Sequence, residues 1–204
     1  MLIYWLKLSK SAWIKKITGE RQQKTTINET KPNHLERYYW AIREMKQRGV
    51  NTVLDAACGT GYGSYMLANA GFKVHAVDIS LDAICWAQIY YSHPNIIYTL
   101  GSVLDVSLAR YDAMVSIETI EHVDEAWVNR LDAPVIVATV PNEDVVPFSP
   151  ETHKFHRKHY TKAEFDALIP GHKQWFTQYD KWDKEQAKMR PGDDGMTLGI
   201  ICER

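Results

Sequence analysis

Short apolar runs alternate with amphipathic stretches along most of the chain. The runs are bounded by turn residues and predict buried strands, while apolar residues three or four positions apart predict helices. The strands expected are Val53–Leu54, Val74–Val77, Asn95–Thr99, Ala113–Ile117, Pro134–Thr139, Gln174–Tyr179 and Met196–Cys202. The helices expected are 33–47, 62–70, 81–91 and one that ends near Ile169, with N-caps at Asn33, Ser80 and Thr161. This alternation predicts an α/β protein with a largely parallel sheet.

A glycine-rich turn follows the first predicted strand. Gly59, Gly61 and Gly63 permit a tight strand-to-helix turn and let a ligand lie against the peptide groups. Asp78 ends the next strand, about 20 residues later, where an acid grips an adenosine ribose in open α/β nucleotide sites. The spacing is G-x-G-x-G, and the Asp55 carboxylate just before it would repel a pyrophosphate. S-adenosylmethionine fits this pattern, because it has no phosphate and carries an ammonium and a sulfonium.

The stretch 55–64 resembles motif I of the class I S-adenosylmethionine-dependent methyltransferases, and 77–80 resembles their ribose-binding strand end. His34-Leu-Glu-Arg37-Tyr38 resembles the H-x-x-R-Y of a bacterial and phage group of type 11/12 methyltransferases that is often found with surface-glycan pathways. The resemblance implies a Rossmann-like, doubly wound sheet of seven strands, mostly parallel with an antiparallel last strand, and helices on both faces. It also implies S-adenosylmethionine as cofactor and S-adenosylhomocysteine as product.

The same resemblance assigns residues to the cofactor. Asp55 and the glycine turn would hold the methionine moiety, and Asp78 the ribose hydroxyls. Ile79, Ser102 and Val103 would flank the adenine, with a serine where the family commonly has an acid. The full set of expected cofactor residues is Asp55, Ala57, Gly59, Gly61, Tyr62, Asp78, Ile79, Ser102, Val103 and Glu118.

Glu118-Thr-Ile-Glu121-His122-Val123 follows the fourth predicted strand, at the sheet edge where ligands bind. It resembles the E-x-x-E-H-V of ubiquinone-pathway O-methyltransferases and of small-RNA 3′-end methyltransferases. In some of these, the two glutamates and the histidine, with a later histidine, hold a divalent metal, and such ligands suit Mg²⁺, Mn²⁺ or Zn²⁺. The alternative is that Glu121 and His122 orient the turn by hydrogen bonds, as in metal-free members. We favour this alternative and assign no metal residue, while a divalent metal stays an open hypothesis.

Three histidines, His153, His156 and His159, lie close together in 142–160, the predicted acceptor loop. Residues 155–161 resemble the F-H-x-R-E-[FY]-[ST] of the glycan-associated group. Loop histidines can bind metal, accept a proton or form a basic edge. His156 is preferred, because its distance to Thr161 matches the later metal histidine of the small-RNA enzymes. His122 and His156 are therefore the predicted catalytic residues.

Composition sets few further limits. The chain has 204 residues, 45% of them hydrophobic and 24% charged, with a formal net charge of −1, so no global field attracts nucleic acid. Cys58, Cys85 and Cys202 are far apart and show no disulfide or metal spacing, which suits a reducing, cytoplasmic location. No apolar run approaches the length that spans a bilayer. The expected domains are an amphipathic extension and polar linker over 1–32 and a methyltransferase domain over 33–204.

The extension carries four apolar residues near one helical face, Ile3, Leu6, Trp13 and Ile17, and lysines lie between them in the sequence. It could be a membrane-surface helix, a lid over the acceptor site, or a helix that packs on its own domain or on a second subunit. We favour packing, which leaves a homodimer or a partner protein open.

The function expected is methyl transfer by direct in-line attack (EC 2.1.1.-), to a hydroxyl of a sugar or another small molecule. No D/N-P-P-Y/F follows the fourth strand, which disfavours DNA base N-methylation of that type. The second hypothesis is metal-assisted methylation of an RNA 3′ end or a nucleotide, so nucleic acid is allowed but not favoured. The third is a catalytically inactive, cofactor-binding partner subunit, because the region after Val123 is shorter than in family members.

Overall fold

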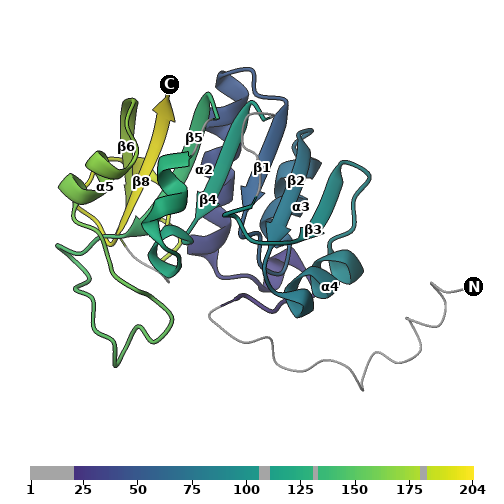
Figure 1. The fold of residues 1–204 in the computed structure, drawn as a ribbon, viewed down its shortest axis with the longest axis horizontal. Coiled ribbons are helices and arrows are strands. Elements are labelled where there is room, and N and C mark those ends of the chain that lie inside the picture. The colour runs from purple at the N-terminus through teal and green to yellow at the C-terminus, as the bar shows by residue number, and fades with distance from the viewer. Residues whose placement is uncertain (1–20, 106–110, 131–132, 180–182) are drawn as a thin grey trace, which may run out of the picture.

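The computed structural model describes residues 21–105, 111–130, 133–179 and 183–204, and the predicted helix within 1–17 lies outside them. In the described part, one sheet of eight strands forms the centre of the protein (Figure 1). The strands are β1 (Thr52–Ala56), β2 (Lys73–Asp78), β3 (Ile96–Leu100), β4 (Ala113–Ile117), β5 (Val135–Pro141), β6 (His172–Gln178), β7 (Arg190–Pro191) and β8 (Thr197–Glu203). The α-helices are α2 (Pro32–Gln47), α3 (Tyr62–Asn69), α4 (Leu81–Tyr90) and α5 (Lys162–Leu168), and the 3-10 turns are η1 (Ile27–Glu29), η2 (Ile120–His122) and η3 (Glu125–Arg130).

The strand order is β3-β2-β1-β4-β5-β8-β6-β7, and β1 to β5 are parallel where they pair. β8 runs antiparallel to both β5 and β6. The predicted doubly wound sheet, mostly parallel with an antiparallel last strand, is confirmed. The sheet has one strand more than predicted: β7, two residues in the connection between the last two predicted strands, which pair with β6. A two-residue strand that contains a proline has no alternating pattern from which it could be predicted.

The order of the strands determines where a ligand can bind. Successive strands are added on one side of β1 up to β3 and on its other side from β4 onward, so β1 and β4 lie side by side. This switch in the order opens a crevice beyond the carboxyl ends of the two strands. The glycine turn follows β1, and the segment with Glu118 follows β4. The two motifs singled out in the sequence therefore meet at one place.

Helices cover both faces of the sheet, and neighbouring strand residues alternate between them. Val53 packs with Trp40 and Met45 of α2 in one core cluster, together with residues of α3 and α4. Leu54 packs in a second cluster with Trp127 of η3 and Phe165 of α5. Helices on both faces were predicted, and the two clusters confirm this.

Two of the three predicted N-caps are present. The Ser80 hydroxyl accepts from the Ala83 amide, and Thr161 forms a capping box with Glu164. Asn33 was wrong as an N-cap, because α2 begins one residue earlier, at Pro32. Proline suits a first helical position, since its φ is already helical and an amide there would have no helical partner.

Within the described ranges, no helix has the length and hydropathy that a membrane-crossing helix requires.

Candidate functional site

The turn after β1 is held in a conformation that few residues adopt. Ala57 and Gly59 have φ values of 59° and 57°, and Gly61, the N-cap of α3, has a φ of 88°. A Cβ at Gly61 would lie 2.5 Å from the Ala87 Cβ and 2.8 Å from the Tyr98 hydroxyl oxygen. This close approach is possible only for glycine, and it brings the backbone of the turn to the edge of the crevice.

Asp78 is tied to the turn, although 19 positions separate it from Gly59. Its Oδ2 accepts from the Gly59 amide at 2.9 Å, and its Oδ1 accepts from the Ser80 amide at 2.8 Å. The Arg21 guanidinium also donates to Oδ1, at 2.9 Å. Asp78 is only 2% exposed, and these three donors satisfy its buried carboxylate.

The segment 21–24 lies across this end of the crevice. The Thr60 hydroxyl donates to the Gln22 carbonyl at 2.6 Å. The Trp86 indole and the Tyr91 hydroxyl both donate to the Lys24 carbonyl, at 3.1 and 3.0 Å. Side chains from the turn, from α4 and from the residue after α4 therefore hold the segment against the domain.

Asp55 lies behind the turn and is fully buried. The Ser64 hydroxyl donates to its Oδ2 at 2.6 Å, and the Tyr38 hydroxyl donates to its Oδ1 at 3.2 Å. Burial raises the pKa of this carboxyl to about 6, although both hydrogen bonds act in the opposite direction. Asp55 does not line the crevice, and its hydrogen bonds lie behind the turn.

One cavity of about 780 Å³ joins the turn to the histidine loop. Most of the predicted site residues line it: Ala57, Gly59, Tyr62, Asp78, Ile79, Ser102, Val103, Glu118, His122 and His156. Asp55 and Gly61 do not. The cavity also takes in Arg21, Arg37, Phe155 and His159, which are not among the predicted cofactor or catalytic residues.

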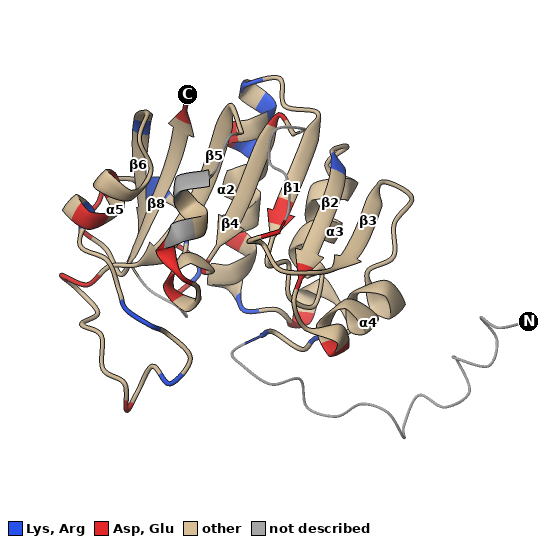
Figure 2. Cartoon of the chain, in the orientation of Figure 1, with Lys and Arg blue, Asp and Glu red and all other residues tan. Residues whose placement is uncertain are grey.

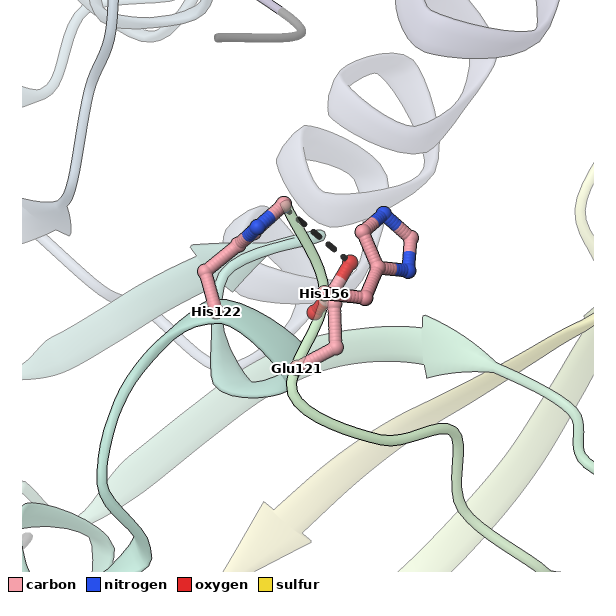
Figure 3. Close-up of side chains that lie close together, drawn as sticks. All are labelled: Glu121, His122 and His156. Carbon is pink, nitrogen blue, oxygen red and sulfur yellow. Dashed lines mark ion pairs between the residues drawn. The ribbon is translucent and has the colours of Figure 1, made fainter. Parts of the chain in front are cut away.

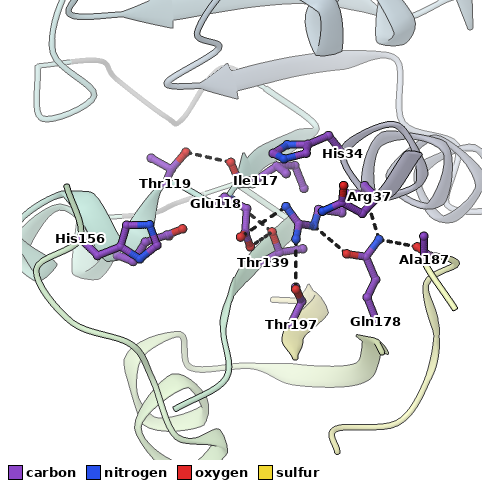
Figure 4. Close-up of polar contacts among 12 residues, drawn as sticks. His34, Arg37, Ile117, Glu118, Thr119, Thr139, His156, Gln178, Ala187 and Thr197 are labelled. Carbon is purple, nitrogen blue, oxygen red and sulfur yellow. Dashed lines mark hydrogen bonds and ion pairs between the residues drawn. The ribbon is translucent and has the colours of Figure 1, made fainter. Parts of the chain in front are cut away.

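Arg37 is a buried cation in the wall of the cavity, only 4% exposed, and Figure 4 shows its polar contacts. It donates to Gln178 Oε1 at 2.9 Å and to Thr197 Oγ1 at 3.1 Å, and its Nη1 lies 3.3 Å from Glu118 Oε2. Gln178 in turn donates to the Asn33 and Ala187 carbonyls. The H-x-x-R-Y motif drew attention to Arg37 in the sequence, but its partners are more than 80 positions away, so the sequence did not indicate these contacts.

Glu118 is engaged within the same network. Its φ is 49°, an unusual value for a residue with a side chain, and its Oε1 accepts from the Thr139 hydroxyl at 3.0 Å. With its other oxygen beside Arg37, the carboxylate points to α2 and β5. It is not part of the cluster that Glu121 forms.

Glu121, His122 and His156 form that cluster, each with one ligand atom within 4.8 Å of the others (Figure 3). Glu121 is fully buried, and its Oε1 lies 3.9 Å from His122 Nε2. The Arg157 amide donates to the Glu121 carbonyl at 2.7 Å, which folds the acceptor loop back onto η2. One carboxylate and two imidazoles are a donor set that Mn²⁺ or Zn²⁺ accepts.

The loop histidines form a packed group with His122. Ring centroids are 4.6 Å apart for His122 and His156, 5.0 Å for His156 and His159, and 4.4 Å for His153 and His159. His159 is 3% exposed, and burial lowers the pKa of its imidazole. The sequence singled out His156 among the three, and the structure places it between His122 and His159.

Comparison with known proteins bears on this geometry. A family model described as "Methyltransferase domain" matches residues 53–133. Rat glycine N-methyltransferase is 43% identical over 54 residues, which cover 26% of this chain and 18% of that protein. A probable S-adenosylmethionine-dependent methyltransferase of Mycolicibacterium smegmatis is 27% identical over 173 residues, which cover 75% of this chain and 63% of that protein. Matches to these curated relatives thus span less than two thirds of the relatives' length.

Among solved structures, the small RNA methyltransferase HEN1 superposes with a TM-score of 0.64 at 16% identity. The match covers 93% of this chain and 28% of HEN1. At this identity the likeness shows a shared fold.

Sheet order, glycine turn and relatives agree on one class, the class I S-adenosylmethionine-dependent methyltransferases. Within that class, the family model and the curated relatives support the type 11/12 group.

Proposed function

We propose that the protein transfers the methyl group of S-adenosylmethionine to a hydroxyl of a sugar or another small molecule. The observation that carries this proposal is that Asp78, His122 and His156 all line one cavity. In such transfer the acceptor oxygen attacks the methyl carbon in line, the carbon–sulfur bond breaks, and S-adenosylhomocysteine leaves. Positioning of the two reactants supplies several kcal/mol of the rate enhancement.

The cofactor would lie along the turn. Asp78 takes the ribose hydroxyls, while Ile79, Ser102 and Val103 border the adenine. Arg37 takes the carboxylate of the methionine moiety, because it is a buried cation in the cavity wall with a planar group suited to carboxylates.

The acceptor would lie beside the histidines. A hydroxyl attacks more readily when a base removes its proton, and imidazole is suited to this near neutral pH. Phe155 lines the cavity while 52% exposed, and it offers an apolar surface to a sugar ring.

The charges of the acceptor loop favour a small acceptor over a polyanion. Arg157 pairs with Asp124 at 3.5 Å, and Lys158 with Glu125 at 3.0 Å. Figure 2 shows basic and acidic residues interspersed over the elements. Nucleic-acid sites depend on uncompensated lysines and arginines gathered on one face.

Calorimetric titration with S-adenosylhomocysteine tests the cofactor assignment. We expect binding that Asp78→Ala weakens tenfold or more, the equivalent of about 1.4 kcal/mol. Asp82→Ala is the matched control, since this exposed acid lies nearby in the first turn of α4 and does not line the cavity. Absence of binding to well-folded wild-type protein would remove the methyltransferase proposal. Sugars and nucleotide sugars with radiolabelled S-adenosylmethionine then test the acceptor.

Metal-assisted methylation of an RNA 3′ end or a nucleotide is the second candidate, and the Glu121, His122 and His156 cluster favours it. Those residues would hold the ion, which would lower the pKa of a bound hydroxyl. We would titrate Mn²⁺ into the protein and into Glu121→Gln, with His153→Ala as the control outside the cluster. Micromolar binding lost only in Glu121→Gln, together with Mn²⁺-dependent methylation of RNA, would favour this candidate over the metal-free sugar reaction.

A further inference from the structure

A backbone carbonyl fixes the proton on one ring of the histidine group. His159 Nδ1 lies 2.5 Å from the Val146 carbonyl oxygen. A carbonyl oxygen can only accept a hydrogen bond, so Nδ1 of His159 carries the hydrogen. The side chain is 1% exposed, and such burial favours the neutral ring. Nε2 of His159 therefore holds a lone pair.

That lone pair determines the state of the next ring. His156 Nδ1 lies 2.8 Å from His159 Nε2, within hydrogen-bond distance. Because Nε2 of His159 accepts, Nδ1 of His156 donates. A neutral His156 then has its own lone pair on Nε2.

We propose that His159 is a positioning residue that holds His156 in the Nδ1–H tautomer and so directs the Nε2 lone pair of His156 to the reaction. The order of donation runs from His156 to His159 and from His159 to the Val146 carbonyl. This inference rests on the proposed function for the role of His156 as base, but the tautomer itself does not.

His122 and His153 show that the arrangement is specific. His122 Nδ1 lies 2.8 Å from the Phe155 carbonyl oxygen, so His122 also carries its hydrogen on Nδ1 and a lone pair on Nε2. His153 is opposite, since its Nδ1 accepts from the Ser149 amide at 3.3 Å and its hydrogen is on Nε2. His122 and His156 thus both belong to the Glu121 cluster and both have a lone pair on Nε2.

The tautomer has a consequence for methyl transfer. As the acceptor oxygen bonds to the methyl carbon, the hydroxyl proton of the acceptor passes to His156 Nε2. The carbon–sulfur bond breaks, and its two electrons remain on sulfur. The products are the methyl ether, S-adenosylhomocysteine and an imidazolium that returns its proton to solvent. With the hydrogen on Nε2 instead, His156 could not accept this proton at that atom.

Long-range proton–nitrogen NMR spectra of protein with ¹⁵N-labelled histidine test the proposal at pH 7.5. Protonated and lone-pair ring nitrogens have well-separated shifts, so each tautomer is read directly. We expect Nδ1–H for His122, His156 and His159, and Nε2–H for His153. A wild-type His156 that carries its hydrogen on Nε2, or that populates both tautomers equally, would overturn the proposal.

Variants separate positioning from packing. His159→Gln keeps one donor and one acceptor and should retain the Nδ1–H tautomer of His156. His159→Phe fills the space without either group and should shift His156 toward a mixture, while His153→Phe should leave it unchanged. An unchanged His156 in His159→Phe would contradict the proposal. Calorimetry with S-adenosylhomocysteine on the same samples keeps failure of the cofactor assignment distinct from failure of the relay.

Discussion

Arg21 and Asp78 form an ion pair at 2.9 Å, and it involves the carboxylate that we propose to bind the ribose of the cofactor. Arg21 reaches it from the segment 21–24, which side chains of the turn and of α4 hold in place. Since Asp78 also accepts from the Gly59 and Ser80 amides, a ribose hydroxyl must share this carboxylate with Arg21 or displace it.

Arg21→Ala is expected to tighten S-adenosylhomocysteine binding two- to fivefold. The side chain of Arg21 is 27% exposed, and such a pair contributes only about 0.2–1 kcal/mol, so its removal relieves a modest competition. Calorimetry of wild type and variant measures the change. Weaker binding in the variant would mean that Arg21 contacts the cofactor and completes the site.

The buried carboxyl of Asp55 should make stability depend on pH. Its folded pKa of about 6 exceeds the ordinary value of 3.8, so the folded protein holds an extra proton between these values. The Asp55 contribution to the unfolding free energy therefore falls as the pH rises from about 4 to about 6, by on the order of 3 kcal/mol. Above that range the contribution is constant.

Asp55→Asn isolates this contribution, because the amide keeps the shape and does not titrate. The difference in unfolding free energy, variant minus wild type, should rise between pH 4 and 6 and stay level from 6.5 to 8. Urea unfolding at each pH gives the difference. A level difference across the whole range would show that Asp55 has an ordinary pKa.

Gly63→Ala should destabilise the protein by about 1–3 kcal/mol, as overpacking does. A Cβ at this position would lie 2.0 Å from a ring carbon of Tyr38, whose hydroxyl bonds to Asp55. The clash outweighs the helix preference for alanine, worth about 0.5–1 kcal/mol. Gly101→Ala is the control, since its Cβ would meet Val77 and Thr99 at 3.9 and 4.0 Å. Equal thermal stability of the two variants would contradict the expectation.

Arg37→Met should lower both stability and cofactor affinity. The substitution keeps an unbranched apolar chain but leaves Gln178 and Thr197 without their donor. We therefore expect the free energy of unfolding to fall by about 2–4 kcal/mol. Arg43→Met, on the exposed face of the same helix, should change stability by less than about 0.5 kcal/mol. If urea unfolding shifts while S-adenosylhomocysteine binds as before, Arg37 supports the fold and does not bind the cofactor.

The sequence predicted those parts of the site that depend on local patterns. The turn at 57–63 and the capping box at Thr161 follow from residues within a few positions of each other, and Asp78 follows from its regular spacing after the turn. Arg37 and Gln178 are 141 positions apart, and Arg21 and Asp78 are 57 apart, so no spacing indicates either contact. Asp55 was expected at the ligand and lies behind the turn, because one residue determines which side of a strand end a side chain faces.

Strand β7 has a consequence for association between molecules. It forms one margin of the described sheet, has two residues, and includes Pro191, which has no amide hydrogen to offer. Short, proline-bearing margins give a second chain little backbone with which to pair. Strand-to-strand aggregation is therefore disfavoured where β7 covers β6, at Phe176 and Thr177, whereas the opposite margin of the described sheet, along β3, presents a regular ladder of five residues to a neighbouring molecule.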